Sequence, residues 1–295
     1  MIRIGMLTSG GDCQSLNATM RGVAKSLYKS YGDEVEIIGF EDGYKGLIYA
    51  DYRIMKPSDF SGILTEGGTI LGTSRQPFKL MRVPDENGLD KVEAMKHTYR
   101  KLKLECLVVL GGNGSQKTAN LLREEGLNIV SLPKTIDNDI GITDHTPGYG
   151  STARYIARTT AEIGADVKSL PIHVCILEAM GRNAGWITAA SALARKKHGD
   201  APHLIYLPER PFREEEFLAD VKELYDRLGG VVVVASEGLK DESGKPVVPP
   251  IFQTGRSVYY GDVGAYLAEL VIKKLGIKAR SEKPGLCGRA SISLQ

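Results

Sequence analysis

A short segment near the middle of the chain carries the residue types best suited to catalysis. Thr135, Asp137 and Asp139 place one hydroxyl and two carboxylates within five residues, directly after an apolar run. If this loop is extended, the two carboxylates point to the same side, and one can hold Mg²⁺ while the other accepts a proton. An Asp- and Asn-rich turn that binds only its own backbone is the alternative. The pattern favours a pocket that removes a proton from an alcohol, as phosphoryl transfer requires.

Three glycine-rich segments follow strand-like runs, and a fourth precedes Arg75. Glycine lets backbone N–H groups approach phosphate oxygens closely, and the start of a following helix attracts anions. Ser115 is expected to cap such a helix, and Arg182 beside a glycine suits a phosphoryl group or sugar hydroxyls. Each segment alone is about equally well explained as a structural turn. The four segments are Thr8–Asp12, Gly67–Ser74, Gly111–Ser115 and Met180–Gly185.

Short β-branched runs alternate with helix-like stretches, which predicts an α/β fold with parallel strands covered by helices on both faces. Two lobes are expected, residues 1–148 for the phosphoryl donor and residues 149–295 for the sugar phosphate, each with a mainly parallel sheet. The active site is expected in the cleft between them, at the carboxyl ends of strands. The expected strands span residues 3–7, 34–40, 106–110, 128–132, 173–178, 203–207 and 230–236. The expected helices span residues 14–29, 90–102, 116–125, 150–168, 183–195, 213–228 and 262–275.

The composition excludes several classes of protein. The 295 residues, 42% of them hydrophobic, suffice for two lobes with a sizeable core. A formal net charge of +2 gives no footprint for nucleic acid or an anionic membrane. No apolar run approaches the roughly 20 residues that a membrane-spanning helix needs, and the first residues resemble a strand, not a signal peptide. The four cysteines form no CxxC pair, which is typical of free thiols in a reducing cytoplasm.

In this order, the segments resemble the phosphofructokinase family, and the similarity runs from Ile4 to Arg289. The resemblance implies transfer of a phosphoryl group from ATP or pyrophosphate to the 1-hydroxyl of fructose 6-phosphate, with Mg²⁺ as cofactor. It implies that Asp137 is the catalytic base and that Thr135 and Arg182 assist it. The residues implied to hold the donor are Gly11, Arg75, Gly112, Asn113, Gly114, Ser115 and Lys134. The residues implied to bind the sugar phosphate are Thr135, Asp137, His173, Met180, Gly181, Arg182, Glu237, Arg280 and Arg289, and those implied near the metal are Asn113 and Asp139.

Two positions give opposite indications of the phosphoryl donor. Gly114 is typical of family members that use ATP, because it leaves space for the nucleotide, whereas Lys134 is typical of pyrophosphate users. ATP is favoured, since a missing side chain bears directly on whether a nucleotide fits. NAD kinase also uses a Gly-Gly-Asp-Gly type of loop, but it would not explain the segments Pro133–Asp139 and Met180–Arg182.

Three further positions depart from the family pattern. Asn113 stands where the family has a metal-side aspartate, so Mg²⁺ would have one charged ligand fewer. His173 stands where many bacterial members have an arginine that reaches the neighbouring subunit's substrate, and a buried strand histidine is the equal alternative. The chain ends soon after Arg289, so the C-terminal part of the family fold is expected to be missing; the full fold would imply a homo-oligomer, a dimer or tetramer. A non-catalytic regulatory homologue therefore remains a further hypothesis.

Overall fold

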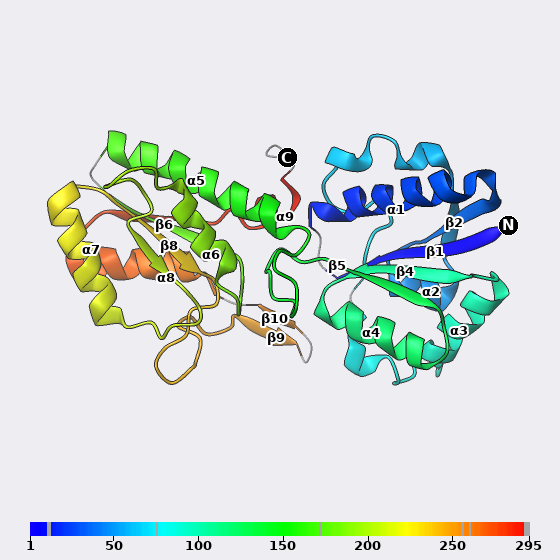
Figure 1. Cartoon of the computed structure of the whole chain (residues 1–295). Helices are drawn as coiled ribbons and strands as arrows, with labels where there is room; N and C mark the ends of the chain where they lie inside the picture. Colours follow the sequence, from blue (N-terminus) through cyan, green and yellow to red (C-terminus); the bar gives the residue numbers. More distant parts are fainter. Residues whose placement is uncertain (11–12, 75, 171–172, 255–256, 260, 292–295) are drawn as a thin grey trace.

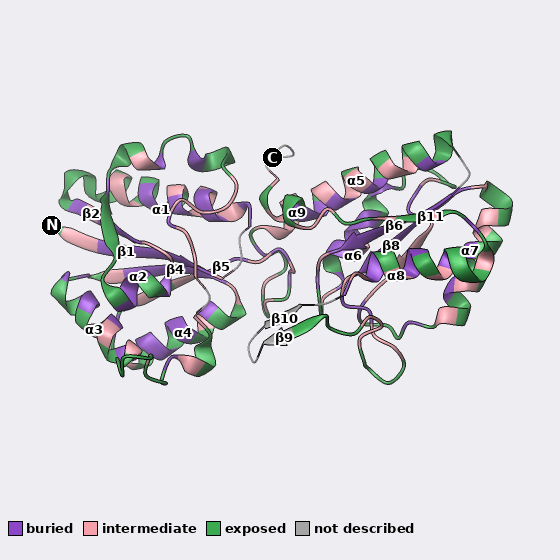
Figure 2. Cartoon of the chain, turned by 180° about the vertical axis from the view of Figure 1, so that it is seen from behind, coloured by how far each residue is buried: buried purple, intermediate pink, exposed green. Residues whose placement is uncertain are grey.

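The chain folds into two lobes that lie side by side, each built around one β-sheet (Figure 1). The computed structural model describes residues 1–10, 13–74, 76–170, 173–254, 257–259 and 261–291. Buried strands occupy the centre of each lobe, and the outward faces of the surrounding helices are exposed (Figure 2). The predicted α/β class, with mainly parallel sheets flanked by helices, is therefore confirmed.

The first lobe surrounds a sheet with the strand order β3-β2-β1-β4-β5. Its strands are β1 (Ile2–Ser9), β2 (Val35–Phe40), β3 (Tyr52–Met55), β4 (Cys106–Gly111) and β5 (Ile129–Pro133), and its helices are α1 (Ser15–Tyr31), α2 (Tyr44–Tyr49), α3 (Lys91–Lys101) and α4 (Asn113–Glu124). All strand pairs are parallel except β2 with β3. Met6 and Val108 pack in the hydrophobic cluster of α1, whereas Leu7 and Val109 pack in the cluster of α2, α3 and α4. Because helices cover both faces, the central strands are apolar on both sides.

The second lobe surrounds a fully parallel sheet with the strand order β11-β6-β8-β7. Its strands are β6 (Val174–Ala179), β7 (Leu204–Tyr206), β8 (Val231–Ser236) and β11 (Ala279–Glu282), beside a hairpin of β9 (Phe252–Thr254) and β10 (Ser257–Tyr259). Its helices are α5 (Tyr149–Ser169), α6 (Trp186–Ala190), α7 (Glu214–Leu228), α8 (Val263–Leu270) and α9 (Leu286–Ala290). Val231 and Val233 pack in the cluster of α7 and α8, whereas Val232 and Val234 pack towards α5 and α6. The alternation of side chains along β8 thus joins two helical layers through one sheet.

Some elements differ from those predicted. The helix expected at residues 183–195 begins only at Trp186 and changes to a 3₁₀ turn at Ser191–Ala194. The helix expected at residues 262–275 ends in a π-helical turn, Val271–Leu275. Strands β3 and β11 and the β9–β10 hairpin were not predicted. The first two lie at sheet edges and carry polar residues, so pairing with a neighbour, and not an apolar pattern, makes them strands.

The lobes share hydrophobic packing. Leu16 of α1 and Ile136 belong to the same buried cluster as Ile156 of α5 and Leu177 of β6. Helix α9 lies between the lobes in both views of the chain (Figures 1 and 2). Helix α5 begins next to the predicted division between residues 148 and 149, while the assignment of one lobe to the donor and the other to the sugar phosphate stays a prediction.

Candidate active site

The carboxyl ends of strands from both sheets face one cleft between the lobes. Ser9 at the end of β1 and Gly112 after β4 line it from the first lobe, and Met180 after β6 and Glu237 after β8 line it from the second. The cleft has a volume of about 550 Å³, within the usual range for a small-molecule site. A ligand in this cleft therefore meets both lobes at the edge where parallel sheets bind their ligands.

The start of α4 is the part of the first-lobe wall best suited to an anion. Gly112 occupies the N-cap position and has no side chain to cap the first N–H groups, which leaves them for a ligand. Ser115 was predicted as the cap, and this is wrong, because the extended backbone of Gly112 starts the helix at Asn113. The buried Ser115 hydroxyl instead lies 3.1 Å from the Ser9 carbonyl oxygen and 2.9 Å from the Ser9 hydroxyl. These contacts join the end of β1 to the start of the helix that follows β4.

Lys134 brings a positive charge to the same wall. Its side chain lines the cleft and is only 5% exposed. Its Nζ and the Ser115 Oγ each lie 3.6 Å from the position that a Cβ on Gly10 would take. The amine thus lies where a phosphate could meet both loops. At Gly114, by contrast, no atom of the described residues outside its own helix lies within 4 Å of the missing Cβ, so this part of the wall is open.

The loop after β5 turns Asp137 into the cleft. The Asp137 N–H donates to the Thr135 hydroxyl at 3.1 Å. Asn138 has a φ of 55°, and its side chain accepts from the Thr146 N–H at 2.8 Å and donates to the Asp144 carbonyl at 3.1 Å. The loop is therefore folded, and the expectation that an extended backbone directs both carboxylates the same way is wrong.

The two carboxylates of this loop have different surroundings. Asp137 is half-buried and lines the cleft, whereas Asp139 is exposed and is not among the described residues that line it. Burial raises the pKa of Asp137 to about 6, and the negative charges of Asp139 and Glu237 add to this rise. Arg182 and Lys134 act in the opposite direction. A carboxyl group that titrates near neutral pH is suited to act as a general base.

The second-lobe wall is formed by the loops after β6 and β8, which bind one another. Glu237 Oε1 accepts a hydrogen bond from the Gly181 N–H at 3.3 Å. The Ser236 hydroxyl donates to the Gly181 carbonyl at 2.9 Å and accepts from the Gly238 N–H at 3.1 Å. Gly181 has a φ of 112°, and a Cβ there would lie 2.5 Å from the Ala184 carbonyl oxygen, so a side chain is excluded. Gly181 is buried behind the wall and shapes the loop that presents Arg182 to the cleft.

Arg289 reaches the cleft from α9, but two other predicted sugar-phosphate residues do not. His173 precedes β6, and Arg280 pairs with Cys175 near the start of that strand, so both lie at the amino end of the second sheet. His173 is buried, and burial lowers its pKa, as does the nearby Arg280. Within one chain, these two residues lie at the end of β6 opposite to the cleft. Their role towards a neighbouring subunit's substrate stays a prediction.

Two predicted donor residues, Gly11 and Arg75, lie outside the described part of the chain. Ser74 and Gln76, on either side of Arg75, do line the cleft, and so does Phe78, which is 39% exposed. Gln76 and Phe78 were not among the predicted site residues. Their position directly after a glycine-rich turn and an arginine was the one signal that could have indicated them.

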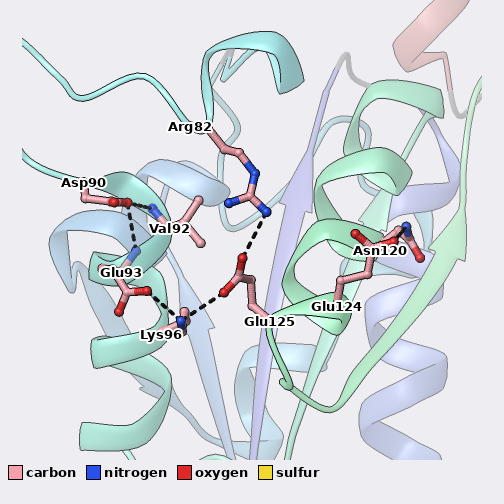
Figure 3. Close-up of polar contacts among 8 residues, drawn as sticks. All are labelled: Arg82, Asp90, Val92, Glu93, Lys96, Asn120, Glu124 and Glu125. Carbon is pink, nitrogen blue, oxygen red and sulfur yellow. Dashed lines mark hydrogen bonds and ion pairs between the residues drawn. The ribbon is translucent and has the colours of Figure 1, made fainter.

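A network of ion pairs holds the segment after Phe78 against the first lobe (Figure 3). Arg82 Nη2 lies 3.0 Å from Glu125 Oε1, and Lys96 Nζ on α3 lies 3.0 Å from Glu125 Oε2. Hydrogen bonds from Lys96 and Arg82 lower the pKa of Glu125. Asp90 caps the start of α3 by accepting from two backbone N–H groups. The chain that carries Phe78 is thus fixed to α3 and to the end of α4.

Few side-chain oxygens in the described part of the cleft could bind Mg²⁺. Asn113, the first residue of α4, lines the cleft, and Asp139 is near enough to Asp137 in the cleft to raise its pKa. In the described ranges, no group of three or more His, Cys, Asp or Glu side chains could hold a metal ion by itself. Mg²⁺ at phosphoryl-transfer sites is commonly held by one or two carboxylates together with substrate phosphates and water. The residues present fit that mode, in which the phosphoryl donor supplies several of the ligands.

The fold and the cleft define a two-lobed α/β protein whose inter-lobe cleft is suited to phosphate groups. The sequence profile described as Phosphofructokinase matches residues 3–293. The chain belongs to the phosphofructokinase family, as its sequence motifs indicated.

Relatives with either type of donor are similar to this chain. ATP-dependent 6-phosphofructokinase 3 of Streptomyces coelicolor is 38% identical over 284 residues, 95% of this chain and 78% of the relative. The ATP-dependent 6-phosphofructokinase of Spirochaeta thermophila is 48% identical over 215 residues, 70% of this chain but only 56% of the relative. The solved pyrophosphate-dependent phosphofructokinase from Marinobacter aquaeolei superposes with a TM-score of 0.82 at 29% identity, covering 99% of this chain and 70% of that one. Similarity therefore gives the family but does not choose the donor.

Proposed function

We propose that this protein is a 6-phosphofructokinase that transfers a phosphoryl group from ATP to the 1-hydroxyl of fructose 6-phosphate, giving fructose 1,6-bisphosphate in glycolysis. One observation carries the proposal. Asp137, with a pKa raised to about 6, lies in a cleft between an uncapped helix start on one lobe and Arg182 on the other. This arrangement places a proton acceptor between a phosphate-binding wall and a wall suited to a sugar.

In this proposal, Asp137 accepts the proton of the 1-hydroxyl as that oxygen attacks the phosphoryl donor. The Thr135 hydroxyl, bonded to the Asp137 N–H, keeps the carboxylate directed into the cleft. Arg182 stabilises negative charge that develops on the transferred group, and the Lys134 ammonium neutralises the donor phosphates. Asn113 and Asp139, together with the donor phosphates, would hold Mg²⁺, which would supply further charge neutralisation.

The remaining cleft residues divide between the two substrates. In this proposal Met180 and Glu237 contact the sugar and Arg289 binds its 6-phosphate, and their positions lining the cleft support these roles. Gly112, Gly114 and the neighbouring N–H groups of α4 receive the donor phosphates.

Two features of the first-lobe wall favour ATP over pyrophosphate. The open space at Gly114 would admit a nucleoside beside the phosphates. Phe78 lines the cleft and is 39% exposed, and an aromatic ring can stack on a nucleobase, which pyrophosphate lacks. Lys134 favours the alternative reaction, because its buried amine matches a compact, highly charged donor. Pyrophosphate-dependent phosphotransfer to fructose 6-phosphate is therefore the second candidate function.

A direct assay separates these functions. The protein is incubated with fructose 6-phosphate, Mg²⁺ and either ATP or pyrophosphate, and fructose 1,6-bisphosphate is measured. Turnover with ATP alone supports the proposal, and turnover with pyrophosphate alone replaces it by the second candidate. Binding of fructose 6-phosphate without turnover by either donor would indicate a regulatory homologue.

Two variants test whether the ATP assignment rests on the residues named. Phe78→Ala should raise the KM for ATP several-fold, since base stacking contributes about 1–3 kcal/mol, and should leave the KM for fructose 6-phosphate unchanged. Gly114→Asp should raise the KM for ATP, because its carboxylate would fill the open space and repel phosphates. Val130→Ala, on the exposed side of β5, is the matched control. Equal KM values for ATP in Phe78→Ala and the control would contradict a role for the ring.

We propose a cytoplasmic location and a homo-oligomer for this protein. Among the helices in the described ranges, none is both long and apolar enough to span a membrane. The exposed Arg280, remote from the cleft of its own chain, supports an assembly in which it serves another copy. Sedimentation analysis at micromolar concentration tests this, and a monomer at all concentrations would contradict it.

A further inference from the structure

A buried hydrogen-bond cluster joins three segments behind the cleft. The Gln14 side chain is 1% exposed, and its Nε2 donates to the Gly288 carbonyl of α9 at 2.6 Å. The Thr152 hydroxyl of α5 lies 3.0 Å from the same carbonyl and 3.4 Å from Gln14 Oε1. These contacts connect positions more than a hundred residues apart in the sequence. Figures 1 and 2 show that α9 lies between α5 and the first lobe.

The Gln14 amide is the principal donor to the Gly288 carbonyl. The Thr152 hydroxyl has one proton and three neighbouring acceptors, because the Gly148 carbonyl also lies 3.2 Å away. The opposite orientation of the Gln14 amide would set its oxygen against the Gly288 oxygen, so the network fixes the orientation. A buried carbonyl that loses its donor is costly, and Thr152 cannot replace Gln14 without giving up its other acceptors.

Gln14 also occupies an unusual place for its type. It is the N-cap residue of α1, a position that favours Ser, Thr, Asp or Asn, whose side chains cap the helix. Its side chain makes no capping hydrogen bond and reaches across to the other lobe instead. The residue choice therefore suits the contact between lobes and not the local helix.

Each connected segment adjoins a wall of the cleft. Gln14 follows the turn after β1, whose Ser9 and Gly10 line the first-lobe wall. Gly288 directly precedes Arg289, which lines the cleft from α9. The α9 segment also touches the glycine-rich turn before Arg75, since a Cβ on Gly67 would lie 2.5 Å from the Ala290 carbonyl oxygen. The Gln14 bond and the approach of Gly67 to Ala290 therefore tie the first lobe to the segment that carries Arg289.

We propose that Gln14 is a positioning residue that couples the two halves of the cleft. Donor phosphates bound beside Ser9 and Gly10 fix the first-lobe wall, and the bond from Gln14 to Gly288 holds α9 against that lobe, so that Arg289 is placed to bind the 6-phosphate of the sugar. Binding of donor and sugar phosphate should consequently strengthen each other, and by linkage the effect is the same in both directions. This inference rests on the proposed function, because it uses the same two substrates.

Titration calorimetry on the full chain tests the coupling without requiring turnover. The Kd of fructose 6-phosphate is measured with and without β,γ-methylene-ATP and Mg²⁺, and the ratio of the two values is the coupling factor. The wild type should give a factor of about five or more, the lower end for coupled sites. Gln14→Met, which keeps the side-chain length but removes the amide, should bring the factor to about one.

Two further variants separate positioning from a structural role. Thr152→Ser keeps the hydroxyl and should keep the coupling factor of the wild type. Gln14→Asn keeps an amide that is too short to reach Gly288, and it should lose coupling even if Gln14→Met does not fold. A lowered Tm in the Gln14 variants with an unchanged factor would overturn the proposal, because a merely structural residue gives that result.

The test also distinguishes this inference from the proposed function. A wild type that turns over ATP and fructose 6-phosphate but has a coupling factor near one refutes the inference alone. A wild type that does not bind fructose 6-phosphate in the first titration refutes both.

Discussion

The two walls of the cleft are built in different ways. The first-lobe wall combines glycine and serine residues, an uncapped helix start and a buried amine from Lys134, and Gln76 and Phe78 line the cleft beside them. The second-lobe wall presents the long side chains of Met180, Arg182 and Glu237, on loops that Ser236 holds from behind. Both walls follow the carboxyl ends of parallel strands, so the difference does not come from the fold.

The difference matches the proposed ligands. A polyphosphate carries dense charge of one kind, and backbone N–H groups approach it closely only where side chains are small. A sugar phosphate has hydroxyl groups at fixed positions, and longer side chains are needed to reach and distinguish them. Substitutions in the second wall should consequently affect the KM for the sugar more than the KM for the donor, whereas substitution of the base between the walls should affect kcat.

The largest expected effect is at the junction of the walls. Asp137→Asn should lower kcat by roughly 10²–10⁴, the range for loss of a general base, with little change in either KM. Steady-state kinetics with both substrates measures this. The matched control is Asp139→Asn, which removes the exposed carboxylate of the same loop and should have the smaller effect on kcat. Equal losses of kcat in the two variants would contradict the assignment of Asp137, and not Asp139, as the base.

The same substitution should stabilise the fold. The pKa of Asp137 in the folded chain, about 6, lies above its ordinary value of 3.8. The ionised carboxylate is therefore less stable in the folded chain than in the unfolded chain, and this lowers the free energy of unfolding fully above pH 6. Asp137→Asn should therefore unfold at a higher urea concentration than the wild type at pH 7.5. The difference in unfolding free energy between the variant and the wild type should shrink as the pH falls through 6 and disappear below pH 3.8.

The next effect concerns how Glu237 of the second wall raises the pKa of Asp137. Asp137 acts only when ionised, so kcat/KM should fall about tenfold per pH unit below its pKa of about 6. Glu237→Gln removes a negative charge that raises this pKa, and the acid limb should move to lower pH. A pH–rate profile measures the midpoint separately from the lower activity of the variant. Glu125→Gln, on the far end of α4, is the control and should leave the midpoint in place.

A smaller effect is expected where the second wall is supported. Ser236→Ala removes one bond to the Gly181 carbonyl and one to the Gly238 N–H, both buried, at a cost of about 1–3 kcal/mol. Urea unfolding should show this loss, and the KM for fructose 6-phosphate should rise while the KM for ATP stays constant. The exposed Ser243→Ala should change neither quantity. Equal increases of both KM values would contradict the separation of the walls.

The smallest effect should come from the ion-pair network beneath the first wall (Figure 3). Arg82→Ala breaks its 3.0 Å contact with Glu125 on the surface of the lobe. Exposed pairs contribute little, so the Tm should fall less than in Ser236→Ala, and added salt should remove most of the difference. A larger loss than that of Ser236→Ala would show that the segment carrying Phe78 depends on this network.

Local patterns in the sequence were enough for the class of fold and for the segments that form the cleft. Apolar runs alternating with amphipathic stretches predicted the central strands, because strands covered on both faces must be apolar throughout. They did not predict β3 and β11, since these edge strands are polar and depend on pairing with a neighbour. The family motifs identified Asp137, Arg182 and Lys134, because each follows a predicted strand at the edge where ligands bind.

The sequence by itself therefore determined the family, the alternation of elements and the chemical types present at the cleft. Only the tertiary structure decided how those groups act. Burial raises the pKa of Asp137 most, and Asp139, Glu237 and Arg182 also shift it; burial and the charges of Glu237 and Arg182, which belong to the other lobe, follow no local sequence pattern. Likewise, the position of Arg280 at the far end of β6 and the bond from Gln14 to α9 result from the packing of sheets and lobes, which brings distant segments together.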